Sequence, residues 1–261
     1  MFHLVAHAVA GTRLFQDWTE AQALWDRLAR VPGLRALVLM PNHVHLVSAV
    51  ADARAFDTAR RAFARWRNNW RGQAGAVWQE RPTVEALPDA LHARRTTRYV
   101  HLNPCRARLV TCPAAWPFST HRDALGLSLK PVRKREPDPV AFHAYVSADP
   151  SCSVNGTPYP GNRMQTERVP VERLAGAVSE LARMPLEQVR ARGPERALWI
   201  SAARSLTSWS GAEIARAVGV HRSQVTRCAP LPAATVAALE RALADERFPG
   251  LVAGDLRLRH R

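Results

Sequence analysis

Two histidines, His43 and His45, lie two positions apart in the apolar stretch MPNHVHLV at residues 40–47. Because side chains alternate between the two faces of a β-strand, both imidazoles lie on the same face, ~7 Å apart along the backbone. Two imidazoles placed in this way can bind one metal ion. Taken alone, a His-x-His pattern fits half-exposed strand histidines better than a metal site, so its interpretation depends on the rest of the chain.

A second stretch, RYVHLNP at residues 98–104, places Tyr99 and Asn103 four positions apart. On a helix this spacing puts both side chains on one face, with Cβ atoms ~5–6 Å apart. A tyrosine hydroxyl can serve as the nucleophile of covalent catalysis, and an amide oxygen can face a metal ion that acts as a Lewis acid. Such an arrangement suits phosphoryl transfer. A lone tyrosine on a helix is usually a packing residue, so this interpretation needs the histidine pair.

Two neighbours of Tyr99 limit what this helix can do. Pro104 disfavours the helical conformation at Asn103, so we expect the helix to end or kink there. His101 is two positions from Tyr99 and points away from it on a helix, which makes it a poor candidate for the general base.

The elements that must position these residues are short strands alternating with helices. We expect strands at residues 2–10, 34–40 and 43–50, and a fourth at 76–79. Thr19 is the expected N-cap of a first helix, because Gln22 follows at the capping-box spacing. A second helix of about eighteen residues should follow Asp52, and a third should follow Asp89. The predicted order begins β-α-β-β.

The second helix carries an aromatic stripe and many arginines. The stripe falls at alternating spacings of three and four, which is typical of a buried helix face, and we interpret it as core. It consists of Phe56, Ala59, Phe63, Trp66 and Trp70. The other faces are expected to form a solvated, positively charged surface with Arg54, Arg60, Arg61, Arg65, Arg67 and Arg71.

The composition of the 261 residues narrows the class of protein. The chain has 37 Lys and Arg against 22 Asp and Glu, a formal net charge of +15. This excess favours a polyanionic partner, whereas a coding bias toward arginine would explain the near absence of lysine but not the excess over acids. The four cysteines show no CxxC pair, and neither a secretion signal nor a long apolar run is present. We therefore expect a soluble, cytoplasmic protein without a membrane partner.

The C-terminal part has a different character. A proline-rich connector is expected at residues 129–168, although residues 140–146 could hold a helical turn, and helical periodicity resumes at Val171. Residues 210–227 have the spacing of a helix-turn-helix, with Gly219 at the turn and Ile214, Val218, Val220 and Val225 packing inside. An ordinary helical bundle is the alternative. The recognition helix, residues 221–228, would offer to DNA the side chains of Arg222, Ser223, Gln224, Thr226 and Arg227.

The two chemical stretches, followed by WPFS at residues 116–119, together resemble the HUH-type single-tyrosine transposases, and most of all their REP-associated branch. The resemblance covers roughly residues 1–125. It implies a ferredoxin-like α/β sandwich in which His43, His45 and Asn103 hold Mg²⁺ or Mn²⁺ and Tyr99 is the nucleophile. The implied reaction cleaves and rejoins single-stranded, hairpin-bearing DNA through a 5′-phosphotyrosine. Separately, residues 195–228 resemble the DNA-binding domain of the replication initiator DnaA.

The sequence also departs from this family. Cys105 stands where valine is more common, and Arg108 where glycine is common. The N-terminal strand is less polar than the family's arginine- and glycine-rich version. The four site residues are all retained.

These observations predict an α+β protein in which an antiparallel sheet has its helices on one face, followed by an all-α helix-turn-helix domain. The expected catalytic domain spans residues 1–128, and the expected helix-turn-helix domain spans residues 169–261. A connector at residues 129–168 joins them. We expect a bacterial, nucleoid-associated monomer or homodimer that acts as a DNA nicking and rejoining enzyme. Backbone contacts are assigned to Arg60, Arg61, Arg65, Arg94, Arg95 and Arg98.

Two alternatives remain at this point. One is a catalytically inert, domesticated DNA-binding regulator, for which the helix-turn-helix alone would suffice. The other is a metal hydrolase that activates water with the histidine pair and forms no covalent intermediate.

Overall fold

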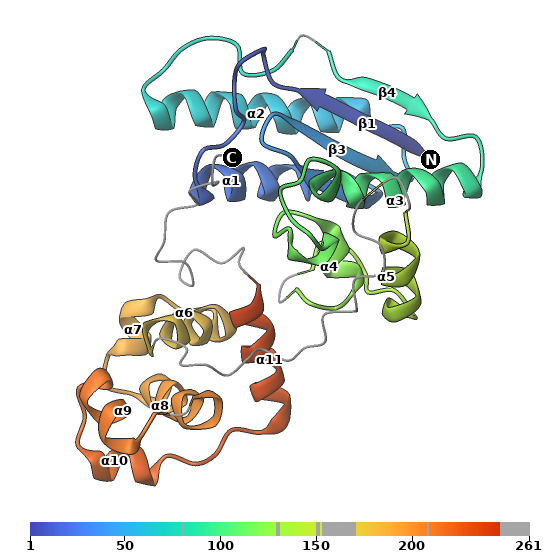
Figure 1. The fold of residues 1–261 in the computed structure, drawn as a ribbon. Coiled ribbons are helices and arrows are strands. Elements are labelled where there is room, and N and C mark those ends of the chain that lie inside the picture. Colours follow the sequence, from blue (N-terminus) through green and yellow to red (C-terminus); the bar gives the residue numbers. More distant parts are fainter. Residues whose placement is uncertain (80, 129–130, 150–151, 153–170, 208, 246–261) are drawn as a thin grey trace. The chain divides into compact units, whose positions relative to one another are not determined.

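The computed structural model describes residues 1–79, 81–128, 131–149, 152, 171–207 and 209–245, drawn in colour in Figure 1. The described residues form two compact units. The first consists of residues 1–126 with the described part of 131–152, and the second contains residues 171–245. The predicted connector is thus partly ordered structure of the first unit, because it contains helix α5, Pro139–Ser147. Residues 153–168 of that connector lie outside the described residues.

The first unit is built on a four-stranded antiparallel sheet in the order β2-β3-β1-β4. Its strands are β1 (Phe2–His7), β2 (Leu34–Leu39), β3 (His43–Ser48) and β4 (Thr83–Ala86). The link at residues 40–42 joins β2 to β3 as predicted. The fourth strand was predicted wrongly at 76–79, where Trp78 forms only a single bridge with Ala8. Residues 77 and 79 bond to the chain just at and after the end of β1, through Val9 N to Val77 O and Gln79 N to His7 O, whereas the regular pairing of β1 is with β4, seven residues later.

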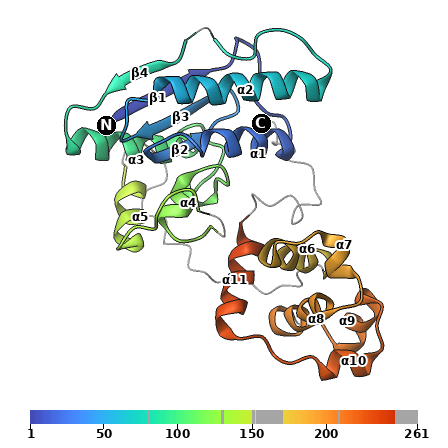
Figure 2. The same ribbon diagram turned by 180° about the vertical axis from the view of Figure 1, so that it is seen from behind.

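Two helices cover one face of the sheet, and a third lies on the other (Figures 1 and 2). Helices α1 (Trp18–Leu28) and α2 (Ala53–Arg71) pack against each other on the first face, whereas α3 (Ala90–Arg106) packs against β2 and β3. The prediction that the helices share one face is therefore correct for α1 and α2 and wrong for α3. The α+β class and the antiparallel sheet are confirmed.

Local capping chemistry sets where these helices begin. Asp52 and Asp89 cap α2 and α3 as predicted, since their carboxylates accept hydrogen bonds from Ala55 N and His92 N, both at 2.8 Å. The N-cap of α1 is Asp17, which accepts from Glu20 N, and not Thr19. An aspartate two positions earlier competes successfully for the same free amides at the helix start.

Alternation along β1 and β3 separates a core face from a histidine face. Leu4, Ala6, Val44 and Leu46 are almost completely buried in one cluster with side chains of α1 and α2. From α2, Phe56 and Phe63 join this core as predicted. Trp70 does not, because its side chain is 59% exposed.

The edge strand β2 is covered by the chain that follows α3. Ser119 bridges Val38, and the indole of Trp116 donates to Leu39 O at 2.8 Å. The Thr120 hydroxyl accepts from Leu37 N at 2.9 Å at the start of α4, Thr120–Ala124. The WPFS motif and its neighbours, including the 3-10 turn Pro113–Ala115, thus satisfy backbone groups that an open edge would leave unpaired.

Two of the residues that depart from the family pattern have a structural explanation. Cys105 is 3% exposed in an apolar cluster with Leu102, Val146 and Cys152, so it occupies the kind of position that suits valine, and burial raises its pKa to about 12. Arg108 follows the end of α3 with φ +57°. That left-handed conformation is the one glycine adopts most easily after a helix, so Arg108 is held there at a cost.

Pro104 lies inside α3, and the helix continues to Arg106. Of the two outcomes expected at Asn103, an end or a kink, the helix end is therefore excluded. Pro104 stands in the last turn of the helix, where its missing amide removes one hydrogen bond only, and its ring is buried.

The second unit is a cluster of helices around its own core, which includes Leu174, Val178, Trp199, Ile200 and Leu239. The predicted helix-turn-helix segment forms α9, a left-handed turn at Gly219 and α10, and Ile214, Val218 and Val225 are buried. A capping box between Ser210 and Glu213 starts α9. The helices are α6 (Val171–Ala182), α7 (Leu186–Arg190), α8 (Pro194–Leu206), α9 (Gly211–Val218), α10 (Arg222–Arg227) and α11 (Ala233–Ala244).

None of the helices in the described part of the chain has both the length and the apolar character that crossing a bilayer requires.

Arginines of α8 close the ends of both α9 and α10. Arg196 donates to Val218 O and Gly219 O, and Arg204 donates to Val225 O and Cys228 O. A six-residue helix such as α10 cannot persist alone, so these guanidinium groups bind the carbonyls that its last turn leaves unpaired.

Arg204→Ala is expected to lower the free energy of unfolding of this unit by about 1–2 kcal/mol, since it removes charged hydrogen bonds to carbonyl groups. Thermal denaturation and amide hydrogen exchange in α10 would measure the effect. Arg216→Ala, an exposed arginine of α9, is the control. An equal loss in both variants, or unchanged exchange protection in α10, would show that Arg204 does not hold the helix.

Candidate active site and nucleic-acid surfaces

Four histidines, and not two, gather on one face of the sheet. The β1–β3 register places His7 opposite His43 and Val5 opposite His45, so His3 and His7 share the face of the pair. The rings of His43 and His45 are 4.8 Å apart between centroids, and His7 stacks on His43 at 5.2 Å. His3 and His7 were missed as site residues. Their odd-numbered positions place both side chains on one face of β1. Only the pairing register with β3 shows that this face is also the face of His43 and His45.

Tyr99 stands beside this histidine face. Its ring lies edge-on to that of His45 at 5.6 Å and to that of His3 at 6.5 Å. The side chain is 41% exposed, so a large substrate can reach the hydroxyl. Residues separated by more than fifty positions in sequence therefore meet at one point, as the phosphoryl-transfer interpretation requires.

Asn103 lies one turn along α3 from Tyr99 and is 8% exposed. Its amide nitrogen donates to Tyr99 O at 3.2 Å. Since only the nitrogen of the amide can donate, this bond fixes its orientation and keeps Oδ1 as the free acceptor.

Hydrogen bonds fix which nitrogen of each ligand-like histidine is available. His43 Nδ1 lies 2.7 Å from Asn42 Oδ1, and His45 Nδ1 lies 3.1 Å from His3 Nε2. His3 Nδ1 in turn lies 3.7 Å from Glu85 Oε2. The Glu85 carboxylate favours a proton on His3 Nδ1 through charge and not through a hydrogen bond. With the proton there, His3 Nε2 accepts from His45 Nδ1, and this is the pair of tautomers that we expect. Within the described residues, Nε2 of both His43 and His45 is left as a lone-pair donor.

The electrostatic environment keeps these rings neutral. Burial, followed by the neighbouring His7, lowers the pKa of His43 to about 4. Burial, followed by His43, His3 and His7, lowers the pKa of His45 to about 3. The pKa of His3 is also lowered by burial, against an opposing effect of Glu85. Neutral imidazole is the form that binds metal ions.

The donor set fits a divalent metal ion. Two neutral imidazoles with free Nε2 atoms, each held through Nδ1 by a second group, follow the usual arrangement around metal-binding histidines. In the described part of the chain, no three side chains among His, Cys, Asp and Glu converge to hold a metal ion. A third ligand would have to come from a group of another type, such as the Asn103 amide oxygen, from water or from substrate.

Positive charge and a cleft adjoin the site. The Arg106 guanidinium carbon lies 5.3 Å from the centre of the Tyr99 ring, and Arg106 also pairs with Asp149 at 2.8 Å. A cavity of about 530 Å³ opens beside His43. Arg13 and the loop after α3 line it, which gives a strand of DNA room to approach the histidines.

The arginines predicted to contact DNA differ in how far their side chains are exposed to solvent. Arg60 is 3% exposed and its guanidinium binds Asp57 and Gln79 O, so it stabilises the fold and does not face solvent. Arg67 is likewise buried, and Arg71 pairs with the buried Glu20. The prediction that all of these side chains form a solvated surface is therefore wrong for the three. Of the arginines assigned to DNA on these helices, Arg61, Arg65, Arg94 and Arg95 are exposed.

Arg98 is half-buried. Its guanidinium carbon lies 5.2 Å from the centre of the Tyr145 ring, and its guanidinium nitrogen lies 3.6 Å from a carboxylate oxygen of Asp149. Arg94 lies over the same ring at 4.2 Å. Both arginines thus help to attach α5 to α3.

His101 is fully buried and bonds Thr120 Oγ1 at 3.2 Å, which agrees with its exclusion as a general base.

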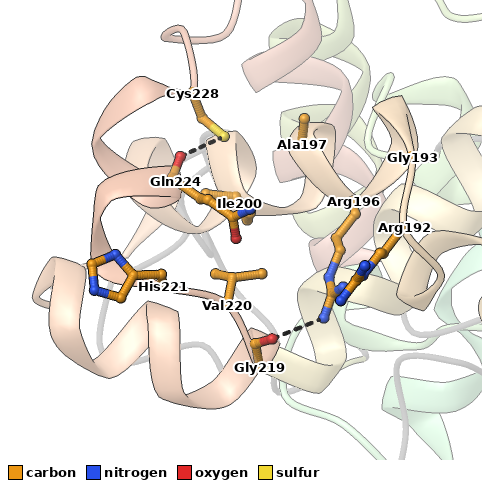
Figure 3. A pocket seen from close by; sticks show the side chains of 10 residues that line it. All are labelled: Arg192, Gly193, Arg196, Ala197, Ile200, Gly219, Val220, His221, Gln224 and Cys228. Atoms are coloured by element: carbon orange, nitrogen blue, oxygen red, sulfur yellow. Dashed lines mark hydrogen bonds between the residues drawn. The ribbon is translucent and has the colours of Figure 1, made fainter.

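In the second unit, the predicted contact residues lie on the outside of α10. Arg222, Gln224, Thr226 and Arg227 are exposed and Ser223 is half-buried. A cavity of about 750 Å³ lies beside them and is lined by Arg192, Arg196, His221 and Gln224 among others. In Figure 3, Arg192 and Arg196 lie on one side of it, with Arg196 directed at Gly219, and Gln224 and His221 lie on the other. The basic surface of α10 therefore continues onto the start of α8, a feature that the sequence analysis did not include.

Comparison with known proteins gives limited support. No family model and no curated protein matches the sequence. Among solved structures, the chain is similar to a REP-associated tyrosine transposase bound to a REP hairpin, with 25% sequence identity and a TM-score of 0.36. The match covers 47% of this chain and 76% of that chain. A score this low does not by itself establish a common fold, so function must be inferred from the residues of the site.

His3→Phe is expected to release His45 from its single tautomer, because the ring shape remains while the hydrogen bond to Nδ1 is lost. Nitrogen-15 NMR of the metal-free protein would show His45 protonated on Nδ1 in the parent and a mixture in the variant. Mn²⁺ affinity should fall about 10-fold or more. His7→Phe is the control, since His7 stacks on His43 and has no hydrogen bond to either ligand-like ring. An unchanged His45 tautomer in His3→Phe would contradict this role.

Proposed function

We propose that this protein is a metal-dependent endonuclease and strand transferase for single-stranded DNA, with Tyr99 as its nucleophile. The observation that carries the proposal is the position of an exposed tyrosine beside two neutral histidines whose Nε2 atoms are both free. Structural strand histidines would be expected to use both nitrogens internally or to point into solvent. A net charge of +15 and exposed arginines on α2, α3 and α10 supply the affinity for a polyanion.

In this reaction the Tyr99 hydroxyl attacks the phosphorus of a DNA phosphodiester. The bond from phosphorus to the 3′-oxygen breaks, the 3′-oxygen takes up a proton, and the 5′-phosphate remains on the tyrosine. Attack by a 3′-hydroxyl reverses these steps and rejoins a strand. No external energy source is needed, because the phosphotyrosine keeps the energy of the broken bond.

His43, His45 and the Asn103 amide oxygen would hold Mg²⁺ or Mn²⁺ in this proposal. When bound, the ion supplies a Lewis acid for a non-bridging oxygen of the scissile phosphate. The chain's own contributions are to keep both imidazoles deprotonated, to orient them through His3 and Asn42, and to place the Arg106 guanidinium near the developing charge.

The fold proposed for the first unit is ferredoxin-like. The β-α-β-β-α-β order of β1 to β4 with α1 and α2, and the strand order β2-β3-β1-β4, support that assignment. Helix α3 would then be the added element that brings the nucleophile to the open face of the sheet.

For the second unit we propose duplex DNA binding through α9 and α10. The two helices joined at Gly219, with buried Ile214, Val218 and Val225 and exposed polar side chains on α10, support a helix-turn-helix. This surface by itself would equally serve an inert regulator, the alternative function. Only the chemistry at Tyr99 separates the two.

Tyr99→Phe is expected to abolish the covalent protein–DNA adduct while changing single-stranded DNA affinity by less than about threefold, since one exposed hydroxyl is lost. Denaturing gels with end-labelled hairpin oligonucleotides and Mn²⁺ would detect the adduct, and fluorescence anisotropy would measure binding. Tyr145→Phe is the control and should form the adduct normally. An adduct that persists in Tyr99→Phe would exclude this nucleophile. Nicking without any adduct in the parent protein would indicate a metal hydrolase, and duplex binding without nicking would indicate a regulator.

Metal affinity is expected to stay nearly constant between pH 7.5 and 5.5. The folded-state pKa values of about 4 and 3 lie below both conditions, so His43 and His45 are neutral throughout. Two histidines with ordinary pKa values near 6.5 would instead lose affinity by about 100-fold at pH 5.5. Isothermal titration with Mn²⁺ at the two pH values distinguishes these outcomes, with a large loss at pH 5.5 contradicting the prediction.

The lowered pKa values of His43 and His45 also determine how the stability of the folded protein changes with pH. Below pH 6.5 the unfolded chain takes up protons on these histidines while the folded protein does not, so stability falls as pH decreases toward 4.

A further inference from the structure

A groove runs between α1 and α2, on the face of the sheet opposite to Tyr99 and the histidines. Its volume is about 460 Å³. Three small side chains of α2 and three arginines of both helices define it. The small residues are Ala55, Ala59 and Ala62, and the arginines are Arg27, Arg30 and Arg54.

Arg27 connects the groove to a pair of tryptophans, of which Trp66 is half-buried and Trp70 is exposed. Trp66 and Trp70 follow Ala62 at successive spacings of four on α2, so they extend the same stripe. Their rings are stacked, with centroids 5.7 Å apart and planes at 12°. Arg27, which lines the groove, lies over the Trp66 ring at 5.3 Å. Trp70 is 59% exposed, so a ligand can reach this side chain beside its stacked partner.

The charges around the groove favour a polyanion. Arg54, Arg61 and Arg65 are exposed and share one side of α2 at spacings of seven and four. The acidic groups that face this region already have partners inside the protein. Asp52 accepts from Ala55 N, Asp57 pairs with Arg60 and Arg61, and Asp26 accepts from Gln22.

An exposed tryptophan stack next to arginines is suited to unpaired bases more than to other polyanions. Stacking on an aromatic ring needs a free base face, which single strands offer and duplexes do not. An acidic peptide could pair with the arginines, but it would leave the exposed side chain of Trp70 unused.

We propose that the groove between α1 and α2, together with Trp66 and Trp70, is a second binding site for single-stranded nucleic acid. Arg27, Arg30 and Arg54 contact its phosphates, and a base stacks on Trp70. The site is separate from the proposed nuclease centre and would hold a single-stranded segment away from the position of cleavage. It requires nucleic acid as a ligand, but it does not require the proposed chemistry at Tyr99.

The test measures binding of fluorescein-labelled oligothymidylate to the full chain by anisotropy, with EDTA present. Arg222→Gln with Arg227→Gln serves as the common background, to reduce binding through α10. Trp70→Ala is expected to weaken binding about 5- to 100-fold, and Trp70→Phe to restore part of it. Arg54→Gln should reduce the dependence of the logarithm of affinity on the logarithm of salt concentration by roughly 0.7. Val140→Ala, which alters an exposed apolar residue of α5, is the matched control.

Photo-crosslinking supplies a direct readout. An iododeoxyuridine oligonucleotide should label the peptide that contains Trp70, as identified by mass spectrometry. Labelling elsewhere with unchanged affinity in Trp70→Ala would overturn the proposal. Displacement of the oligonucleotide by polyglutamate, with the same affinity in Trp70→Ala as in the parent, would also overturn it and would indicate an acidic peptide as the ligand. A change of oligomeric state in Trp70→Ala, measured by ultracentrifugation, would overturn it as well and would indicate a contact between copies of the chain. Because EDTA removes the metal ion, loss of the Tyr99 adduct and loss of this site are scored independently.

Discussion

The pairing register of β1 with β3 is the constraint on which the first unit depends. Leu4, Ala6, Val44 and Leu46 must face α1 and α2 to be buried, and this requirement turns the alternate positions toward the other face. His3, His7, His43 and His45 occupy those positions. A slip of one residue would expose the core and turn the histidines inward, so the hydrophobic effect that holds the sheet together also fixes the geometry of the site.

The nucleophile is positioned by a second layer of contacts. Helix α3 packs on the histidine face, and the segment after it returns along the edge of β2, where Ser119 and Thr120 bond to the strand. His101, on the buried side of α3, bonds Thr120 in turn. Tyr99 is therefore attached to the strand edge through its own helix, which limits how far it can move from His45. Such rigidity suits in-line attack on a phosphate, for which small displacements are costly.

The arginine excess serves two purposes that composition does not separate. Arg60, Arg67 and Arg71 bind acidic groups or carbonyls of the first unit, and Arg196 and Arg204 bind the helix ends of the second. These guanidinium groups are structural, because each binds groups that burial or a helix end would otherwise leave unpaired. Exposed arginines lie instead on the outer sides of α2, α3 and α10. The surfaces proposed for nucleic acid are those where arginine remains exposed beside an aromatic ring or a recognition helix.

Much of the chain could be predicted from local patterns. Alternating apolar residues determined β2 and β3, aspartate caps determined the starts of α2 and α3, and the glycine corner determined the α9–α10 turn. The family motif named the four proposed site residues, and the structure brings Tyr99 to the histidine pair. These features depend on residues within a few positions of each other, or on a motif read as a unit.

The remaining features required tertiary structure, because they depend on which segments meet. The stripe on α2 predicted Trp70 as core, but only Phe56 and Phe63 of the stripe are completely buried, and Trp70 is 59% exposed. Arg60 was predicted to be solvated, but the return of the chain at Gln79 buries it. His3 gains its relation to His45 only from the register of strands forty residues apart. Sequence alone thus determined which groups could do chemistry, and the packing of distant segments decided which of them face each other and which face solvent.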